Sequence, residues 1–327
     1  MELPVRLTRV QRALAAALLV PVLAVAWLES RSPAASCART GEPWTAFFAL
    51  ATPGAAVPRL FWAVYNPVRR TGDLIYLPET TQLPGERTTL AKAYAAARRD
   101  GGSEMDGAKA MAEAAEKALL PAPKEAQQAQ GDGPVFVPGR FYYDEQMGPA
   151  DAEEEPPLAG LRFLREHVSG NGLWRALARR HGGRGLEPFE LFRVAVEWHS
   201  IKDDDLRAAY FPEDADERRS YIQRLLGEPG PAQARETTVE ILNASGKPGF
   251  ASGLKKILRS KGADVMSTGN APPRSRTLVL DRVGRPELAA QVRRMLNCPS
   301  ARALTQIDAK RLVDVSVVIA DDCPQRE

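Results

Sequence analysis

Residues 238–265 read TVEILNASGKPGFASGLKKILRSKGADV. Alternating apolar residues over Thr238–Leu242 predict a strand, and the composition of Asn243–Gly249 is typical of a tight turn. Apolar residues at helical spacing then predict an amphipathic helix over Phe250–Lys261, and Asp264–Ser267 predicts a second strand. The stretch therefore predicts a strand–turn–helix–strand unit, which is the repeating piece of an α/β fold.

The turn in this unit contains Gly246, Pro248 and Gly249, and we assign these three residues a structural role because tight turns favour them. A helix that follows a glycine-rich turn can also present backbone N–H groups to a phosphate. The spacing here matches neither GxGxxG nor the GK[ST] ending of a phosphate-binding loop, so we do not predict a phosphate site.

The residues that follow continue the same alternation of elements. Strands are predicted over Thr277–Leu280 and Val313–Ala320, and a helix over Pro286–Leu296 begins with proline, which the first helical turn favours. We therefore predict a small α/β sandwich domain over residues 236–323. The proline- and glycine-rich residues 227–235 before it predict a linker.

A larger α/β domain is predicted over residues 44–226. Strands over Leu60–Tyr65 and Leu74–Leu77 flank a turn-forming segment and predict a hairpin. Gly148–Pro157 is acidic, with Glu153–Glu155 in a row, and predicts a solvated loop. Further strands are predicted over Trp44–Leu50, Val135–Val137, Phe141–Tyr143 and Leu206–Tyr210, and helices over Thr88–Arg99, Gly107–Leu120, Leu158–Val168, Leu173–Arg180, Glu190–His199 and Glu217–Leu226.

The N-terminus predicts a membrane helix. Arg6, Arg9 and Arg12 precede the uncharged run Ala13–Leu28, and basic residues on that side keep the N-terminus in the cytoplasm. Residues 1–30 therefore predict either a signal anchor or a cleaved signal peptide, followed by a linker at 31–43. We expect a single-pass protein of the cell membrane whose bulk is extracytoplasmic, or a secreted protein if the leader is cleaved.

The net charge is too small to indicate a partner, whereas the cysteines agree with an exported protein. The chain has 327 residues and a formal net charge of +3, and from Glu236 onward it has 15 Lys/Arg and 10 Asp/Glu, a net charge of +5. A mildly basic domain is suited to an anionic polymer or lipid surface, but so small an excess favours an ordinary solvated surface. Because exported domains keep disulfides, Cys298 and Cys323 are a candidate pair, and the alternative is two thiols; Cys37 is left over.

The C-terminal pieces resemble the LytR C-terminal domain family. They are the quoted stretch, Gly269-Asn270-Ala271, TLVL, and VDVSVVIADD near the end, and together they span about Glu236–Asp322. Members of this family occur behind envelope-assembly domains or behind plain membrane anchors. The resemblance therefore implies a cell-envelope location more than an activity.

Residues 44–231 resemble, more distantly, the LytR-CpsA-Psr catalytic domain. WTAFFALAT, LFWAVYNPVRRTGDLIYLPETTQLPG and ELFRVAVEWHSIKDDDLRAAYFP carry the likeness. That family transfers lipid-linked glycopolymers to the cell wall and holds the pyrophosphate with arginines and a divalent metal. This chain has Pro78-Glu79-Thr80 where the family has Pro-Arg-Asp, so a carboxylate replaces a phosphate-binding arginine. The resemblance thus implies a degenerate relative of α-β-α architecture.

Other candidate chemistry has little support in the sequence. The three histidines, His167, His181 and His199, lack the spacing of a zinc site. Asp203–Asp205 is read as a solvated acidic turn, because calcium loops have more regular spacing. Basic pairs without interleaved aromatic residues do not predict nucleic-acid binding. We predict no catalytic residue, no metal ligand and no cofactor.

The sequence favours a non-catalytic extracytoplasmic cell-envelope protein that binds wall glycopolymer or envelope-assembly proteins. The alternative is a divergent phosphotransferase that attaches a polyprenyl-pyrophosphate-linked glycopolymer to the cell wall and uses a divalent metal such as Mg²⁺. The expected partners are the membrane, through the N-terminal helix, and an anionic wall polymer or a polyprenyl lipid.

Overall fold

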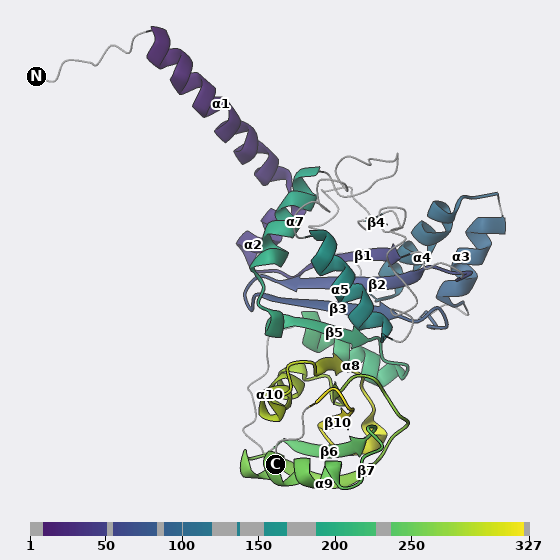
Figure 1. Ribbon diagram of the computed structural model, residues 1–327. Coiled ribbons are helices and arrows are strands. Elements are labelled where there is room, and N and C mark those ends of the chain that lie inside the picture. Colours follow the sequence, from purple (N-terminus) through teal and green to yellow (C-terminus); the bar gives the residue numbers. More distant parts are fainter. Residues whose placement is uncertain are drawn as a thin grey trace, which may run out of the picture.

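The computed structural model describes residues 9–50, 55–83, 88–99, 101–119, 136–137, 154–168, 188–226 and 237–323. Helices and strands form layers around one central sheet, so the predicted α/β fold class is confirmed (Figure 1). The predicted helix over Leu173–Arg180, the predicted strand over Phe141–Tyr143 and the predicted linker at 227–235 lie outside the described residues.

The N-terminal unit, residues 33–226, contains half of the sheet. β1 and β2 pair antiparallel, and so do β2 and β3, which confirms the predicted hairpin. In its turn, Asn66 Oδ1 accepts hydrogen bonds from the N–H groups of Val68 and Arg69, at 3.1 and 3.0 Å. β5 then pairs parallel with β3. The strands are β1 (Trp44–Leu50), β2 (Arg59–Asn66), β3 (Thr71–Leu77), β4 (Phe136–Val137) and β5 (Leu206–Tyr210).

Helices cover both faces of this half-sheet because its strands are apolar on both sides. α3, α4 and α8 pack on one face around the buried side chains of Trp62, Ile75 and Met111. α2, α5 and α7 pack on the other face, around Phe61 and Leu74. The helices are α2 (Pro33–Thr40), α3 (Leu90–Arg99), α4 (Glu104–Leu119), α5 (Pro156–Val168), α7 (Pro188–Ser200) and α8 (Ala215–Leu226).

The C-terminal unit, residues 237–323, has both of its helices on one face of the sheet. α9 and α10 cover the buried side chains of Val239, Val279 and Val317 on that face. Gly249 has a positive φ of 77° directly before α9, and Gly246 has one of 72°, so both positions of the predicted turn favour glycine. The elements are β6 (Thr238–Asn243), α9 (Phe250–Ser260), β7 (Asp264–Asn270), β8 (Leu278–Asp281), α10 (Pro286–Leu296), β9 (Arg302–Thr305) and β10 (Val315–Ile319).

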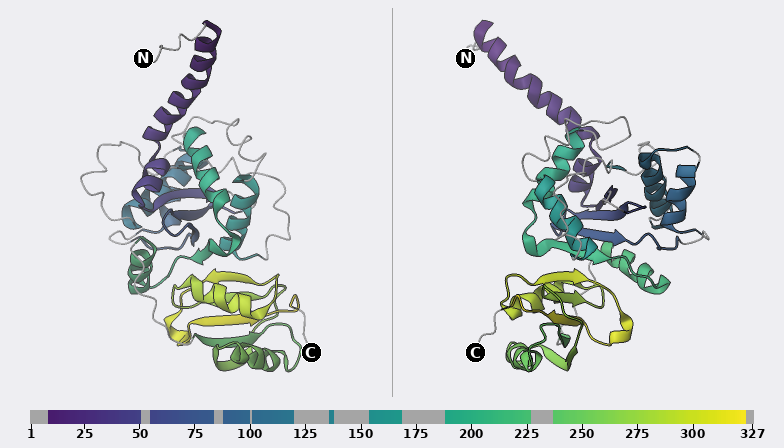
Figure 2. Two further views of the ribbon diagram at one scale, coloured as in Figure 1. Left: turned by 90° about the vertical axis from the view of Figure 1, so that its left-hand side faces the viewer. Right: turned by 45° about the vertical axis from the view of Figure 1, so that its right-hand side comes forward.

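The two predicted domains share one sheet. Among the described residues its strand order is β4-β1-β2-β3-β5-β9-β8-β10-β6-β7, and β5 pairs parallel with β9 through Ala209 and Thr305. We call this boundary between the two units the seam, and Figure 2 shows the two units stacked across it. β9, which makes the pairing, was not predicted, because its four residues, RALT, have no distinctive alternation.

An apolar cluster closes one face of the seam. Leu158 of α5 lies 8% exposed in one cluster with Leu278, Leu280 and Leu304 of the C-terminal unit. Because these side chains come from both units, their burial stabilises the units as one body.

The predicted linker at 31–43 is wrong, because residues 33–40 form helix α2. Ser32 caps the helix by accepting a hydrogen bond from the Ala35 N–H at 3.1 Å, and Pro33 occupies the first turn. Gly41 ends the helix in the left-handed conformation, with φ of 78°. These are ordinary start and stop residues for a helix, and we read them as loop formers because the segment is short and polar.

α1 (Arg9–Arg31) extends away from the rest of the protein (Figure 1). In the part of the chain that the structure describes, no helix combines the length and apolar character needed to cross a membrane. The side chains of residues 13–18, which belong to the predicted apolar run, lie outside the described ones.

We predict that Leu158→Ala lowers the free energy of unfolding by about 2–4 kcal/mol, because it opens a cavity in the shared cluster. All five tryptophans precede residue 227, so their fluorescence reports on the N-terminal unit, whereas circular dichroism reports on both units. In urea unfolding of the full chain, the transitions seen by fluorescence and by circular dichroism should both move to lower urea concentration by the same amount. Val196→Ala, at a position 44% exposed, is the control; a shift in only one signal would contradict a shared core.

Candidate functional site

Two buried carboxylates lie on the face of the seam that α8 and α10 cover. Asp73 on β3 is opposite Arg207 on β5, and Asp281 on β8 is opposite Thr305 on β9. Asp73 is 6% exposed and Asp281 is 0% exposed. We call Asp73 and Asp281 the seam carboxylates, because they come from different units and lie on the two sides of the β5–β9 pairing.

Burial governs the protonation of both seam carboxylates. It raises the pKa of Asp73 from 3.8 to about 6, against the opposing charge of Arg207. Burial also raises the pKa of Asp281 from 3.8 to about 6, although Val283 N–H and Thr305 Oγ1 each donate to it at 3.0 Å. Glu287, at the start of α10, raises the pKa of both groups.

Tyr221 of α8 connects the two seam carboxylates electrostatically. Burial raises the pKa of its phenol, and the charges of Asp73 and Asp281 raise it further. Arg224, one turn later on α8, donates a hydrogen bond to the backbone oxygen of Val283 in the other unit. The group is thus an enclosed acid cluster that links the two units, and its members are too buried to receive a substrate directly.

Acidic residues also bridge the opposite face of the seam. Glu155 accepts a hydrogen bond from the Tyr210 hydroxyl and pairs with Arg274 of the C-terminal unit at 2.6 Å. Glu154 pairs with Arg162 at 2.9 Å and with Arg276 at 3.5 Å. The prediction that these glutamates belong to a solvated loop is therefore wrong: both are partly buried where α5 begins. Glu153 lies outside the described residues.

The predicted acidic turn Asp203–Asp205 is a short 3-10 helix whose first two residues form ion pairs. Asp204 pairs with Arg293 and, at 3.6 Å, with Arg294, both on α10 of the other unit. Asp203 pairs with Arg165 of α5 at 2.5 Å. Asp204 therefore contributes to holding the units together, which is a role that its sequence pattern does not indicate.

The positions that resemble a degenerate phosphate-binding motif do not belong to the seam. Pro78, Glu79 and Thr80 follow β3 at the end opposite to Asp73, in the turn that leads toward α3. The backbone oxygen of Pro78 accepts from Thr81 N–H at 2.9 Å, and that of Glu79 accepts from Ala91 N–H at 3.0 Å. The Glu79 side chain is exposed, so this carboxylate faces solvent.

The predicted turn before α9 is held together by its own side chains. Asn243 Oδ1 accepts from the Ser245 N–H at 3.0 Å, and Asn243 Nδ2 donates to the Lys247 backbone oxygen at 2.8 Å. Gly246, Pro248 and Gly249 lie in this closed loop, where the glycines supply the positive φ values. The turn thus has a structural explanation that needs no ligand.

Cys298 and Cys323 form a disulfide in the structure, with a Cα–Cα distance of 5.4 Å. The bond links the end of α10 to the segment after β10, and both residues are buried. The carboxylate of Asp322 lies beside them, but sulfur atoms bonded to each other are not thiolate ligands, so this group does not make a metal site. Cys37 lies half-buried on α2 against the core of the N-terminal unit.

The histidines are not brought together with these groups. His199 is exposed near the end of α7. His181 and the side chain of His167 lie outside the described residues. The seam carboxylates and Tyr221 were missed by sequence reasoning; the available signal was an aspartate within or at the end of an apolar strand, in TGDLIYL and LVLD, where a charged residue is rarely buried without a partner.

We predict that Asp73→Asn reduces the pH dependence of stability. Because the pKa of Asp73 is about 6 in the folded protein and 3.8 ordinarily, the folded state holds the proton more tightly. Proton binding at Asp73 therefore stabilises the folded protein. This contribution is complete below about pH 4 and is lost as the pH rises through about 6. Between pH 3 and pH 8, the free energy of unfolding of the variant should rise by roughly 3 kcal/mol relative to that of the wild type.

Urea unfolding across this pH range measures the change. Glu113→Gln, at a position 52% exposed on α4, is the matched control and should keep the slope of the wild type. If Asp73→Asn shows the same slope as the wild type, the raised pKa is contradicted.

We predict that replacing both Cys298 and Cys323 with serine lowers the free energy of unfolding by about 3 kcal/mol, because the bond closes a loop with a sequence separation of 25. Urea unfolding with and without reductant measures it. Reductant should destabilise the wild type and Cys37→Ser equally and leave the double variant unchanged. A wild type insensitive to reductant would contradict the prediction.

Comparison with known proteins gives a family for the C-terminal unit. No curated protein matches the chain. Among solved structures, the Lin1025 protein from Listeria innocua aligns with 58% of this chain and 100% of its own length, at 9% identity and a TM-score of 0.36. The likeness of residues 44–226 to LytR-CpsA-Psr domains stays a prediction. Residues 236–322 match the family described as "LytR cell envelope-related transcriptional attenuator", and the C-terminal unit is therefore a LytR C-terminal domain.

Proposed function

We propose that this protein is a non-catalytic, extracytoplasmic protein of the cell envelope that α1 holds at the membrane. Its two units would bind a wall glycopolymer or an envelope-assembly protein. The observation that carries this proposal is the LytR C-terminal domain at residues 236–322, since the description of that family relates it to the cell envelope.

The exposed side chains of α1 support a membrane anchor. Six large apolar residues on this helix are between 49% and 64% exposed: Leu19, Val20, Val22, Leu23, Val25 and Trp27. Removing such side chains from water is worth about 1.5–3 kcal/mol for each one that becomes fully buried. The 23 residues of α1 would span about 35 Å as a helix, against a bilayer core of about 30 Å.

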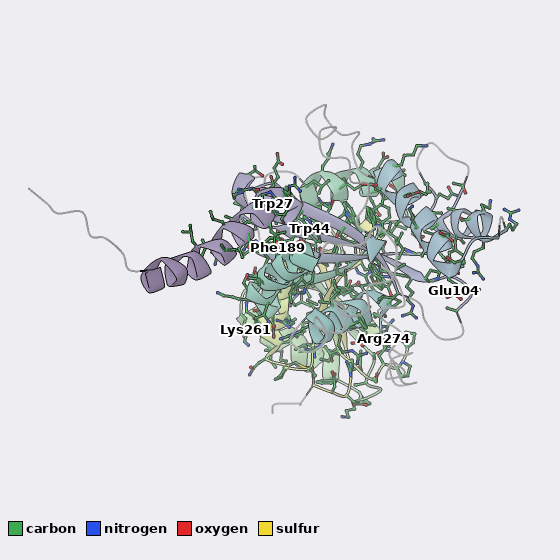
Figure 3. All side chains as sticks on the ribbon, turned by 90° about the horizontal axis from the view of Figure 1, so that it is seen from above. Trp27, Trp44, Glu104, Phe189, Lys261 and Arg274 are labelled. Carbon is green, nitrogen blue, oxygen red and sulfur yellow. A yellow bond between two sulfur atoms is a disulfide. The ribbon has the colours of Figure 1, made fainter. Side chains whose placement is uncertain are left out.

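The end of α1 also suits a membrane–water boundary. The Arg31 guanidinium lies 4.3 Å from the centre of the Trp27 ring. Tryptophan and basic residues are enriched at the edge of a bilayer, where an aromatic ring and a charge can both be accommodated. Figure 3, seen from above, shows Trp27 at the base of α1 on one side of the protein, far from Glu104 on α4.

The charge at the degenerate motif supports a non-catalytic role. Stabilising a transferring phosphoryl group requires positive charge close to it. Glu79 instead presents an exposed carboxylate where the resembled transferases have an arginine. The seam carboxylates do not replace that machinery, because they are buried and their own pKa values are raised.

We predict that a C-terminal fusion after Glu327 is exported. Alkaline phosphatase fused there should be active, since its disulfides form only outside the cytosol, and green fluorescent protein fused there should be dark. Leu19→Arg with Leu23→Arg should abolish membrane retention, because each arginine costs about 2.5–3.5 kcal/mol at the centre of a spanning helix.

The matched control is Val68→Arg with Met266→Arg, which places the same charges at exposed apolar positions outside α1, 75% and 59% exposed. A fluorescent cytosolic fusion would contradict the proposed location. Transfer of a polyprenyl-pyrophosphate-linked glycopolymer by the purified full chain with Mg²⁺ would contradict the non-catalytic role.

A further inference from the structure

The net positive charge of the C-terminal unit comes from the segment that contains α9. Residues 244–263 contain no aspartate or glutamate, and they contain five basic residues: Lys247, Lys255, Lys256, Arg259 and Lys261. Ala251, Leu254 and Leu258 face the sheet and are buried, so the basic side chains lie on the opposite side of the helix. Lys256, Arg259 and Lys261 are exposed, and Lys255 is partly exposed.

The cations at the end of α9 have backbone oxygens as their hydrogen-bond partners, whereas the arginines at the seam are paired with carboxylates. Arg259 donates to the backbone oxygen of Val265 at 2.8 Å, and Lys261 donates to that of Met295 at 2.6 Å. Within residues 237–323, neither of them, nor Lys255 or Lys256, lies in ion-pair contact with a carboxylate. The basic residues that do pair are Lys247 with Asp321, Arg274 with Glu155, Arg276 with Glu154, Arg285 with Glu287, Arg293 and Arg294 with Asp204, and Arg311 with Glu240 and Asp308.

The geometry of the helix sets the spacing of these charges. Residues three or four apart on a helix have Cβ atoms about 5–6 Å apart, which relates Lys255 and Lys256 to Arg259. The side chain of Ser252 is exposed on the same helix and adds a hydroxyl donor, whereas the Ser260 hydroxyl donates to the backbone oxygen of Ile257 at 2.8 Å. This row of cations fits a flexible chain that carries an anionic group at each short repeat.

The position of α9 separates it from the proposed membrane. α9 lies at the end of the protein opposite to α1 in Figure 1, and both views of Figure 2 agree. Eight strand-to-strand steps separate β1 from β7, which is roughly 40 Å at about 4.8 Å for each step. A membrane surface potential is screened within about 8 Å at physiological salt, so lipid headgroups around α1 would not attract α9.

We propose that the exposed cationic face of α9, formed by Lys255, Lys256, Arg259 and Lys261, binds a polyanionic wall glycopolymer with phosphodiester repeats. This inference rests on the proposed function, because it requires that the C-terminal unit is outside the membrane. It identifies the polymer-binding surface and the class of ligand. The continuous sheet across the seam holds this surface away from the bilayer, toward the space that such a polymer occupies.

The test compares three forms of the full chain in nanodiscs of zwitterionic phosphatidylcholine. They are the wild type, the α9 variant Lys255→Gln/Lys256→Gln/Arg259→Gln, and the α3 variant Lys92→Gln/Arg98→Gln/Arg99→Gln. The α3 variant is a matched control, because it removes the same charge from exposed positions on a helix of similar length. Lys261 is retained because it ties α9 to the end of α10. The probe is lipid-free poly(glycerol phosphate), titrated at about 50 mM and about 500 mM salt.

We expect the wild type and the α3 variant to bind the probe alike at low salt, and the α9 variant to bind about tenfold more weakly or worse. The salt dependence of the α9 variant should also be shallower, because fewer cations contact the polymer. Equal thermal stability of the two variants excludes unfolding as the cause. An equal loss of polymer affinity in both variants, or no polymer binding by the wild type, would overturn the inference.

A second arm uses vesicles of phosphatidylglycerol and phosphatidylcholine. If the α9 variant loses vesicle binding but keeps polymer binding, α9 recognises a membrane and the inference is wrong. Because these measurements use purified protein, they do not depend on orientation in the cell. The fusion experiment tests orientation separately. A failure of the proposed location can therefore be distinguished from a failure of polymer binding by α9.

Discussion

The pairing of Ala209 with Thr305 joins β5 to β9, and the arrangement of the whole protein depends on it. Through this pairing the strands of both units belong to one sheet, and the helix layer of α3, α4 and α8 continues into α9 and α10. A single bridge is weak by itself, so the side chains above and below the sheet must hold the strands in register.

The two faces of the seam use different physical means. On one face, leucines from both units exclude water, and Glu154 and Glu155 pair with arginines at the edge of that apolar cluster. On the other face, the seam carboxylates are enclosed beneath α8 and α10. Burying them is unfavourable when they are charged, which is why their pKa values rise. The seam therefore combines a stable apolar contact with an acid cluster that is sensitive to pH.

Ion pairing across the seam also shapes the outer surface. Arginines 274, 276, 293 and 294 all face carboxylates of the N-terminal unit, so much of the positive charge of the C-terminal unit is neutralised there. The basic residues near the end of α9 are not neutralised in this way. Among the described residues, the exposed cations at the end of α9 thus keep no carboxylate partner across the seam, and they lie at the end of the protein opposite to α1.

Much of the fold was predictable because local patterns are strong in it. The hairpin of β2 and β3, the β6–α9–β7 unit and the helices α3, α4, α8 and α10 were all predicted within a few residues. β9 was missed because four residues have too little periodicity, and α2 was read as a linker although its caps are present. The acid cluster was missed because burial of Asp73 and Asp281 depends on which strands become neighbours.

Local sequence patterns were sufficient to predict the α/β class, the likeness of residues 236–322 to a known domain family, and the candidate cysteine pair. Each of these depends on residues close in the chain or on a recognisable order of elements. The folded protein shows three further facts: the two units share a sheet, acidic residues of the predicted loops bridge them, and α9 lies far from α1. Those facts depend on contacts between residues distant in sequence, and the periodicity and composition of a segment do not show which distant segment it will contact.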